Sequence, residues 1–162
     1  MNNDAAELNN KLKEIAGHRP LVILGVGSEL RGDDAWPFHL INAFKGLSLP
    51  QVSFIWGSTL PESYIKPIVK TKPSAVLVCD SAHLDVKPGA LRFFDTADIA
   101  PEGPLSHRMS LRSLALMLEE RAECKVYFLL MQPRNLEFGE ALSAEAENSL
   151  NGLINTLKSL LK

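Results

Sequence analysis

The sequence is poor in cysteine and has no long apolar run, and these two absences set the first limits. The only cysteines, Cys79 and Cys124, show no metal or redox spacing, so neither a disulfide scaffold nor a closed structural zinc site is expected. No apolar run approaches the ~18 residues of a membrane span. The polar first 18 residues carry no apolar segment typical of a signal peptide. We therefore expect a cytoplasmic protein with two free thiols.

An excess of charge of either sign is also missing. The chain has 17 basic and 19 acidic residues, for a net charge of −2, and no basic stripe. Nucleic acid is therefore not an expected partner. A hydrophobic content of 46% and a length of 162 residues are typical of one soluble domain. We predict a single domain over residues 1–162, in which residues 1–20 form an N-terminal helical extension.

Short apolar runs alternate with helical patterns along the chain. The predicted strands are 21–26, 52–56, 75–79, 90–94 and 125–131, and the predicted helices are 4–17, 34–44, 64–70, 111–121 and 144–161. Continuous apolar strands alternating with helices predict a mostly parallel sheet that is covered on both faces. The expected fold class is a three-layer α/β/α sandwich around a twisted five-stranded sheet. Such folds bind ligands beyond the carboxyl ends of their strands.

Candidate functional groups follow the predicted strands. Asp33 and Asp34 come after the first strand, Asp80 comes after the third, and His107 precedes the helix at Leu111. Two carboxylates and an imidazole suit nickel, zinc or another divalent ion with coordination positions left open. If the helix begins near Ser106, its dipole disfavours imidazolium, so His107 stays neutral and able to bind metal.

Each of these residues also has a simpler interpretation. Asp33 or Asp34 can cap the following helix, because aspartate is a favoured N-cap residue. Asp80 can be a turn former, and His107 a surface or capping histidine. Cys79 precedes Asp80, so strand alternation turns its side chain to the opposite face, which predicts a core position.

Glycines before the aspartates raise the alternative of nucleotide binding. Gly25, Gly27 and Gly32 give GxGxxxxG, whereas the dinucleotide fingerprint is GxGxxG. Asp33 and Asp34 would repel the pyrophosphate that a helix N-terminus attracts. No Lys-Ser or Lys-Thr pair follows Gly32, so the phosphate-binding loop of nucleotide hydrolases is absent too. The pattern disfavours nucleotide binding.

Four segments resemble the motifs of one known family, in order and at a similar spacing. LGVGSELRGDD at residues 24–34 resembles an opening motif of roughly GxGNxLxxDDGxG, that of the NiFe hydrogenase maturation endopeptidases. LVCDSAHLDVKPGALRFFD at 77–95 resembles its strand-aspartate segment, and PLSHRMSL at 104–111 its histidine segment. LLMQPRNLEFGEALS at 129–143 resembles its late Gln-Pro to Leu-Ser segment. The resemblance covers about residues 21–160.

The resemblance implies an endopeptidase that removes the C-terminal extension of a nickel-loaded hydrogenase large-subunit precursor. It implies the same α/β fold, a monomer and no organic cofactor. Asp34, Asp80 and His107 match the residues with which the family binds nickel, an ion that the precursor carries. Aspartate rather than glutamate at position 34 resembles the branch that serves formate-hydrogenlyase and related hydrogenases.

The chemistry at these positions has two open routes. The metal can act as a Lewis acid or activate a water, or Asp34 or Asp80 can act as a general base. A covalent acyl-enzyme is disfavoured, because no Ser-His-Asp or Cys-His arrangement is evident at useful positions.

Three residues depart from the family motif. Ser28 replaces the usual asparagine and can still form a local turn. Ala35 replaces a glycine, which is harmless if its backbone is helical, and Pro37 suits a first helical turn. These departures affect the groove and the choice of precursor. Two other functions stay open: a stand-alone metal-dependent hydrolase, and a nickel-checking chaperone that binds the precursor without cutting it.

Overall fold

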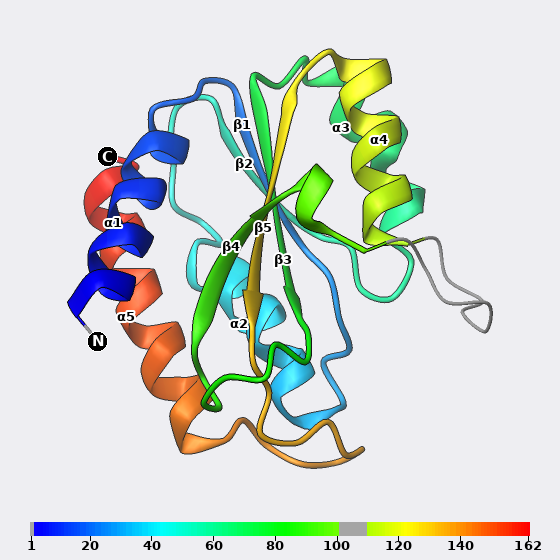
Figure 1. Ribbon diagram of the computed structural model, residues 1–162. Helices are drawn as coiled ribbons and strands as arrows, with labels where there is room; N and C mark the ends of the chain where they lie inside the picture. The colour runs from blue at the N-terminus through cyan, green and yellow to red at the C-terminus, as the bar shows by residue number, and fades with distance from the viewer. Residues whose placement is uncertain (1, 101–109) are drawn as a thin grey trace.

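The computed structural model describes residues 2–100 and 110–162, and the predicted strands and helices are present in the predicted order (Figure 1). The strands are β1 (Leu21–Gly25), β2 (Val52–Trp56), β3 (Ala75–Ser81), β4 (Leu91–Asp95) and β5 (Lys125–Met131). The α-helices are α1 (Asn2–Ala16), α2 (Trp36–Ala43), α3 (Ile65–Lys70), α4 (Leu111–Ala122) and α5 (Ala144–Leu160). Two short 3₁₀ helices, η1 (Gly32–Ala35) and η2 (Pro61–Tyr64), lead into α2 and α3, and a third, η3 (Thr96–Asp98), follows β4.

The five strands form one mostly parallel sheet in the order β2-β1-β3-β5-β4. β1, β2, β3 and β5 run parallel, and β4 pairs with β5 in the antiparallel direction at one edge. β4 is antiparallel because it follows β3 after a loop of nine residues (82–90), and a parallel return needs a longer crossover. The predicted fold class is confirmed.

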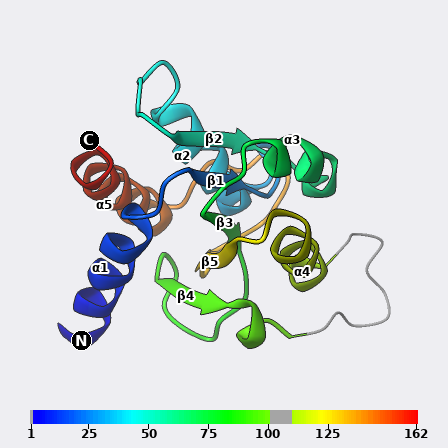
Figure 2. The ribbon, with the colours of Figure 1, turned by 90° about the horizontal axis from the view of Figure 1, so that it is seen from above.

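Helices cover both faces of the sheet, which gives three layers (Figure 2). Helices α1, α2 and α5 pack on one face, where Ile23 and Leu77 are fully buried. Helices α3 and α4 pack on the other face, against Leu24 and Val78. Successive side chains of a strand thus point into the cores on opposite faces of the sheet. Both faces are buried, so these strands are continuous apolar runs in the sequence.

Helix α1, in the segment predicted to be an extension, contributes to the core. Its Leu12 and Ile15 are 1% exposed and belong to the cluster beneath α5. Within the described residues, no helix has the length and apolar character needed to cross a membrane.

Two predicted boundaries are wrong in ways that affect the candidate site. The strand predicted to end at Cys79 continues through Asp80 to Ser81, because both residues pair with β5 opposite Leu130 and Met131. The helix predicted from Asp34 begins at Trp36, and Asp34 lies in the 3₁₀ helix η1.

Candidate active site

The candidate site lies where the carboxyl ends of the parallel strands meet. The loops after β1 (residues 26–31), β3 (82–90) and β5 (132–143) gather there, at the lower end of the molecule in Figure 1. This arrangement follows from the topology, because parallel strands place their carboxyl ends at one edge of the sheet.

Glycines shape the first loop around Asp34. The backbone N–H of Ser28 donates to Asp34 Oδ2 at 2.8 Å, which fixes the direction of the half-buried carboxylate. Gly27 has φ of +146°, and a Cβ there would lie 2.3 Å from the Asp34 carbonyl oxygen. Only glycine fits so close a backbone contact at positive φ. The loop therefore places a carboxylate, rather than a phosphate, at the end of β1.

The three departures from the family motif fit the local backbone. Ser28 Oγ accepts a hydrogen bond from the Leu30 N–H at 3.3 Å, as expected for a local side-chain turn. Ala35 has φ of −84°, so glycine is not needed there. Pro37 lies in the first turn of α2. The expectations for the local backbone at all three positions are confirmed.

Asp80 lies in the penultimate position of β3 and is half-buried. Its Oδ1 accepts the Ser81 N–H at 2.7 Å, so a backbone amide orients this carboxylate as well. Cys79 is fully buried, which confirms its predicted core position. The turn interpretation of Asp80 is wrong, because the residue is paired within the sheet.

Two hydrogen bonds tie the Asp34 segment to the end of β3. The indole N–H of Trp36, a fully buried side chain, donates to the Asp80 carbonyl oxygen at 3.3 Å. Ser81 Oγ donates to the Asp33 carbonyl oxygen at 3.2 Å. The structure therefore brings the Asp34 and Asp80 segments to one edge of the sheet, as predicted.

Asp33 is fully buried and binds the loop after β5. Its carboxylate accepts the Arg134 N–H at 2.7 Å, the Ser143 N–H at 2.7 Å and the Ser143 hydroxyl at 2.8 Å. Hydrogen bonds of this kind compensate the cost of burying a charge. The helix-cap interpretation is wrong for both aspartates, because Arg31 and Ala35 are the N-cap residues of η1 and α2 and neither makes a side-chain cap bond.

The loop after β5 packs directly on the glycine-aspartate motif. The Gly32 N–H donates to the Glu140 carbonyl oxygen at 3.1 Å, and the Asp33 N–H donates to the Asn135 carbonyl oxygen at 3.0 Å. Gly32 has φ of +47°, and a Cβ there would lie 2.5 Å from Asn135 Oδ1. Ser143, besides binding Asp33, is the N-cap of α5. The first and last resembling segments therefore form one unit.

Gln132 fastens the loop between β3 and β4 to the same unit. Its side-chain Oε1 accepts the Leu84 N–H at 2.6 Å, and its backbone carbonyl oxygen accepts the Gly89 N–H at 2.8 Å. The residue is 9% exposed. Sequence reasoning noted the Gln-Pro motif but not this structural role.

The comparisons with known proteins agree with this geometry. A family model described as hydrogenase maturation protease matches residues 38–159. The chain belongs to the hydrogenase maturation protease family. It is 33% identical to the hydrogenase 3 maturation protease of Escherichia coli K12 over 116 residues, which cover 69% of this chain and 72% of that protein.

Solved structures of the family share the fold. The NiFe hydrogenase maturation protease HycI from Thermococcus kodakarensis KOD1 has a TM-score of 0.85 at 25% identity, covering 93% of this chain and 98% of that one. The endopeptidase HycI from Escherichia coli has a TM-score of 0.75 at 26% identity, covering 86% and 89%. The protein is thus a peptide hydrolase of this family. The region matched by the family model contains Asp80 but begins after Asp34. The choice of Asp34 as a site residue therefore rests on the first sequence motif and on the position of its segment beside β3.

The third predicted site residue of the protease, His107, lies outside the described residues. Helix α4 begins at Leu111 after Ser110, whose side chain accepts the Ser113 N–H, so the premise of a helix start near Ser106 is wrong. Among residues 2–100 and 110–162, no three His, Cys, Asp or Glu side chains are grouped as metal ligands.

Neither thiol of the protease is suited to act as a nucleophile. Burial raises the pKa of Cys79 far above its usual range, and the charge of Asp80 raises it further. Burial and then the charge of Glu119 raise the pKa of Cys124 to about 11. Both groups are therefore neutral thiols near pH 7, whereas the thiolate is the reactive form.

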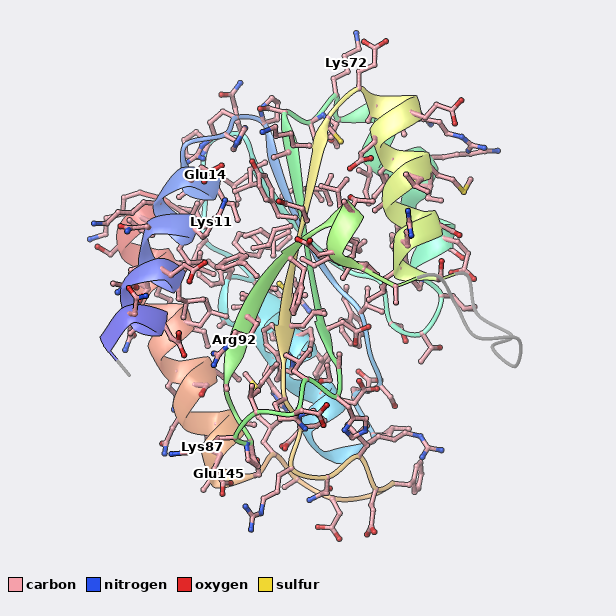
Figure 3. The ribbon with its side chains drawn as sticks, viewed as in Figure 1. Lys11, Glu14, Lys72, Lys87, Arg92 and Glu145 are labelled. Carbon is pink, nitrogen blue, oxygen red and sulfur yellow. The ribbon has the colours of Figure 1, made fainter. Side chains whose placement is uncertain are left out.

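A serine and a histidine do meet in the protease, but at the opposite edge of the sheet. His18 Nδ1 lies 2.9 Å from Ser74 Oγ, just before the start of β3. The Tyr127 hydroxyl donates to Glu14 Oε1 at 3.2 Å, and Figure 3 shows Glu14 near the carboxyl end of α1. These bonds fasten the end of α1 to the sheet, away from Asp34 and Asp80.

Proposed function

We propose that this protease removes the C-terminal extension of a NiFe hydrogenase large-subunit precursor after nickel has been inserted. In this proposal Asp34, Asp80 and His107 bind the nickel of the precursor, so the metal is part of the substrate. The observation that carries it is the pair of carboxylates at one edge of the sheet, each oriented by a backbone amide. Carboxylate and imidazole ligands suit a divalent ion that keeps open positions for the precursor.

The proposed ligands give the enzyme a way to sense nickel. A precursor without metal offers no cation for Asp34 and Asp80 to bind, and two carboxylates held at one edge of the sheet repel each other. Nickel in the precursor would offset this repulsion and place the nearby peptide bond beside the site. Cleavage is thereby limited to loaded precursor.

Two routes for the hydrolysis remain in the proposal. In one, the nickel of the precursor polarises the peptide carbonyl or activates a water. In the other, Asp34 or Asp80 takes the proton of the attacking water, in the manner of an aspartic-type endopeptidase. The raised pKa values of both thiols support hydrolysis by water rather than through a thioester.

The cellular setting belongs to the same proposal. We place the reaction in the cytoplasm, since both cysteines are free and a reducing compartment keeps thiols in this state. We propose that the protein acts as a monomer. Aspartate at position 34 supports a precursor of the formate-hydrogenlyase branch.

The deciding experiment measures the mass of a large-subunit precursor after incubation with the purified protein, with and without nickel. Nickel-dependent loss of a short C-terminal peptide is the expected result. Binding without a change of mass would instead indicate a nickel-checking chaperone. A resident metal in the protein purified without precursor, together with cleavage of small substrates, would indicate a stand-alone hydrolase.

A further inference from the structure

Exposed apolar side chains gather at the edge of the sheet that carries the candidate site. Within the described residues, five large apolar side chains are exposed: Leu30, Leu47, Leu60, Leu116 and Phe138. Leu30, Leu60 and Phe138 lie in loops that follow the carboxyl ends of β1, β2 and β5. Leu47 precedes β2 at the other edge, and Leu116 lies on α4. Exposed apolar residues that cluster at one place indicate an interaction surface.

Leu30 and Phe138 lie on two loops that are paired with each other. Arg31 forms an isolated antiparallel bridge with Phe138, and the Gly139 N–H donates to the Leu30 carbonyl oxygen at 2.8 Å. The Arg31 guanidinium carbon lies 5.9 Å from the centre of the Phe138 ring, within the range of a cation–π contact. Yet Leu30 is 56% exposed and Phe138 is 68% exposed. The bridge thus holds two apolar side chains in solvent.

The buried carboxylate of Asp33 makes this arrangement rigid. It accepts hydrogen bonds from Arg134 and Ser143, which stand on either side of Phe138 in the sequence. Both ends of the loop are therefore fixed to the segment that carries Leu30. A surface fixed before binding loses little conformational entropy when a partner covers it.

The distance along the chain connects this surface to the proposed nickel site. Leu30 lies four positions before Asp34 in the chain, so their Cα atoms are at most ~14 Å apart. A standard protein interface covers roughly 800 Å² on each partner, a patch on the order of 30 Å across. A protein whose metal binds at Asp34 therefore also covers Leu30 and Phe138, which lie on the two bridged loops.

We propose that Leu30 and Phe138 are contact residues for the folded large-subunit precursor, next to its nickel-carrying segment. This inference rests on the proposed function. The partner is a protein surface with an apolar patch, because a small molecule bound at Asp34 would not extend over both loops. Leu30 and Phe138 supply affinity, whereas Asp34 supplies the check for metal.

The test compares the double variant L30S/F138S with the control L47S/L116S on nickel-loaded precursor. Each variant replaces two exposed apolar residues by serine, so thermal unfolding should differ little from wild type. We expect KM for the precursor to rise roughly tenfold or more in L30S/F138S, with the loss of rate recovered at high precursor concentration. The control should keep the wild-type KM.

The outcomes separate this inference from the proposed function. If wild-type protein cleaves the precursor and L30S/F138S has a KM within twofold of wild type, the contact residues are wrong and the function stands. An equal rise of KM in the control pair would also overturn the assignment. If wild-type protein does not cleave, the proposed function fails. In that case the dissociation constant of the precursor is measured for the same variants. A rise of roughly tenfold or more in L30S/F138S, but not in L47S/L116S, would support the contact residues, and a value within twofold of wild type would overturn them.

Discussion

Asp33 and Ser143 lie 110 residues apart in the chain and are joined by two hydrogen bonds. The Ser143 N–H and hydroxyl donate to the two carboxylate oxygens of Asp33 at 2.7 and 2.8 Å. This pair links the glycine-aspartate motif at the start of the domain to the start of the last helix. The neighbouring Asp34, a proposed nickel ligand, therefore lies on a segment that is hydrogen-bonded to the start of α5.

Replacing Asp33 by asparagine should destabilise the fold. Asparagine keeps one acceptor oxygen, so its NH2 group would face either the Arg134 N–H or the Ser143 N–H and leave that donor without its acceptor. We expect the free energy of unfolding to fall by about 2–4 kcal/mol, measured by urea denaturation. Asp34→Asn, at a half-buried residue, is the control and should cost about 1 kcal/mol or less. Equal losses for the two variants would contradict the structural role of Asp33.

Ser143 can be compared with a second helix cap. Ser110 accepts the Ser113 N–H at the start of α4, and Ser143 accepts the Ala146 N–H at the start of α5. Only Ser143 also donates to a buried carboxylate. Ser110→Ala should cost about 1 kcal/mol for the cap, and Ser143→Ala about 1–2 kcal/mol more. The same destabilisation in both variants, in urea titrations, would show that the bond to Asp33 contributes nothing.

Replacing Asp34 or Asp80 should abolish processing without unfolding the protein. Each half-buried carboxylate accepts a hydrogen bond from a backbone amide, and neither residue lies in the core. We expect the Asp34→Asn and Asp80→Asn variants to cleave precursor at least about 100-fold more slowly, because a nickel ligand and a possible base are lost together. Asp85→Asn, an exposed carboxylate in the loop after β3, is the matched control. Wild-type turnover by Asp34→Asn would reject this site.

Gly27 should be needed for the placement of Asp34. Gly27→Ala would put a Cβ 2.3 Å from the Asp34 carbonyl oxygen, so the loop must move and the carboxylate moves with it. We expect cleavage to fall by at least about tenfold, as a displaced catalytic group usually costs one to two orders of magnitude. Gly46→Ala also has positive φ but open space around it, so it should cost about 1 kcal/mol and leave cleavage intact. Equal cleavage by both variants would count against the tight fit.

The sequence predicted the sheet better than the connections at its edge. The strands 52–56 and 125–131 have the predicted bounds, because a residue outside the apolar run, Gly57 or Gln132, directly follows each of them. The sequence predicts Asp80 after β3 rather than within it, because the pairing of Asp80 depends on Leu130, which lies 50 residues later. Local signals such as capping propensity depend on neighbouring residues and cannot predict pairing with a residue so far along the chain.

The same limit applies to the candidate site. The position of Asp34 followed from the rule that ligands bind beyond strand ends, and the structure places it beside the end of β3. The role of Asp33 could not be derived locally, because its partners Arg134 and Ser143 lie more than 100 residues away. The one local indication of a further role is that the sequence has two adjacent aspartates, whereas a helix N-cap needs a single one.

The two thiols should affect stability at high pH and leave cleavage unchanged. Burial raises the pKa of Cys124 from its ordinary value of 9.0 to about 11, and raises that of Cys79 further. The folded protein therefore keeps protons that the unfolded chain loses above pH 9, so the free energy of unfolding should decrease as pH rises from 9 to 11. Cys124→Ser should show a smaller decrease over this range than wild type. Iodoacetamide near pH 7 should modify the folded protein slowly, at Cys124 before Cys79, and should not alter precursor cleavage. Rapid inactivation by this reagent would mean that a thiol takes part in the reaction after all.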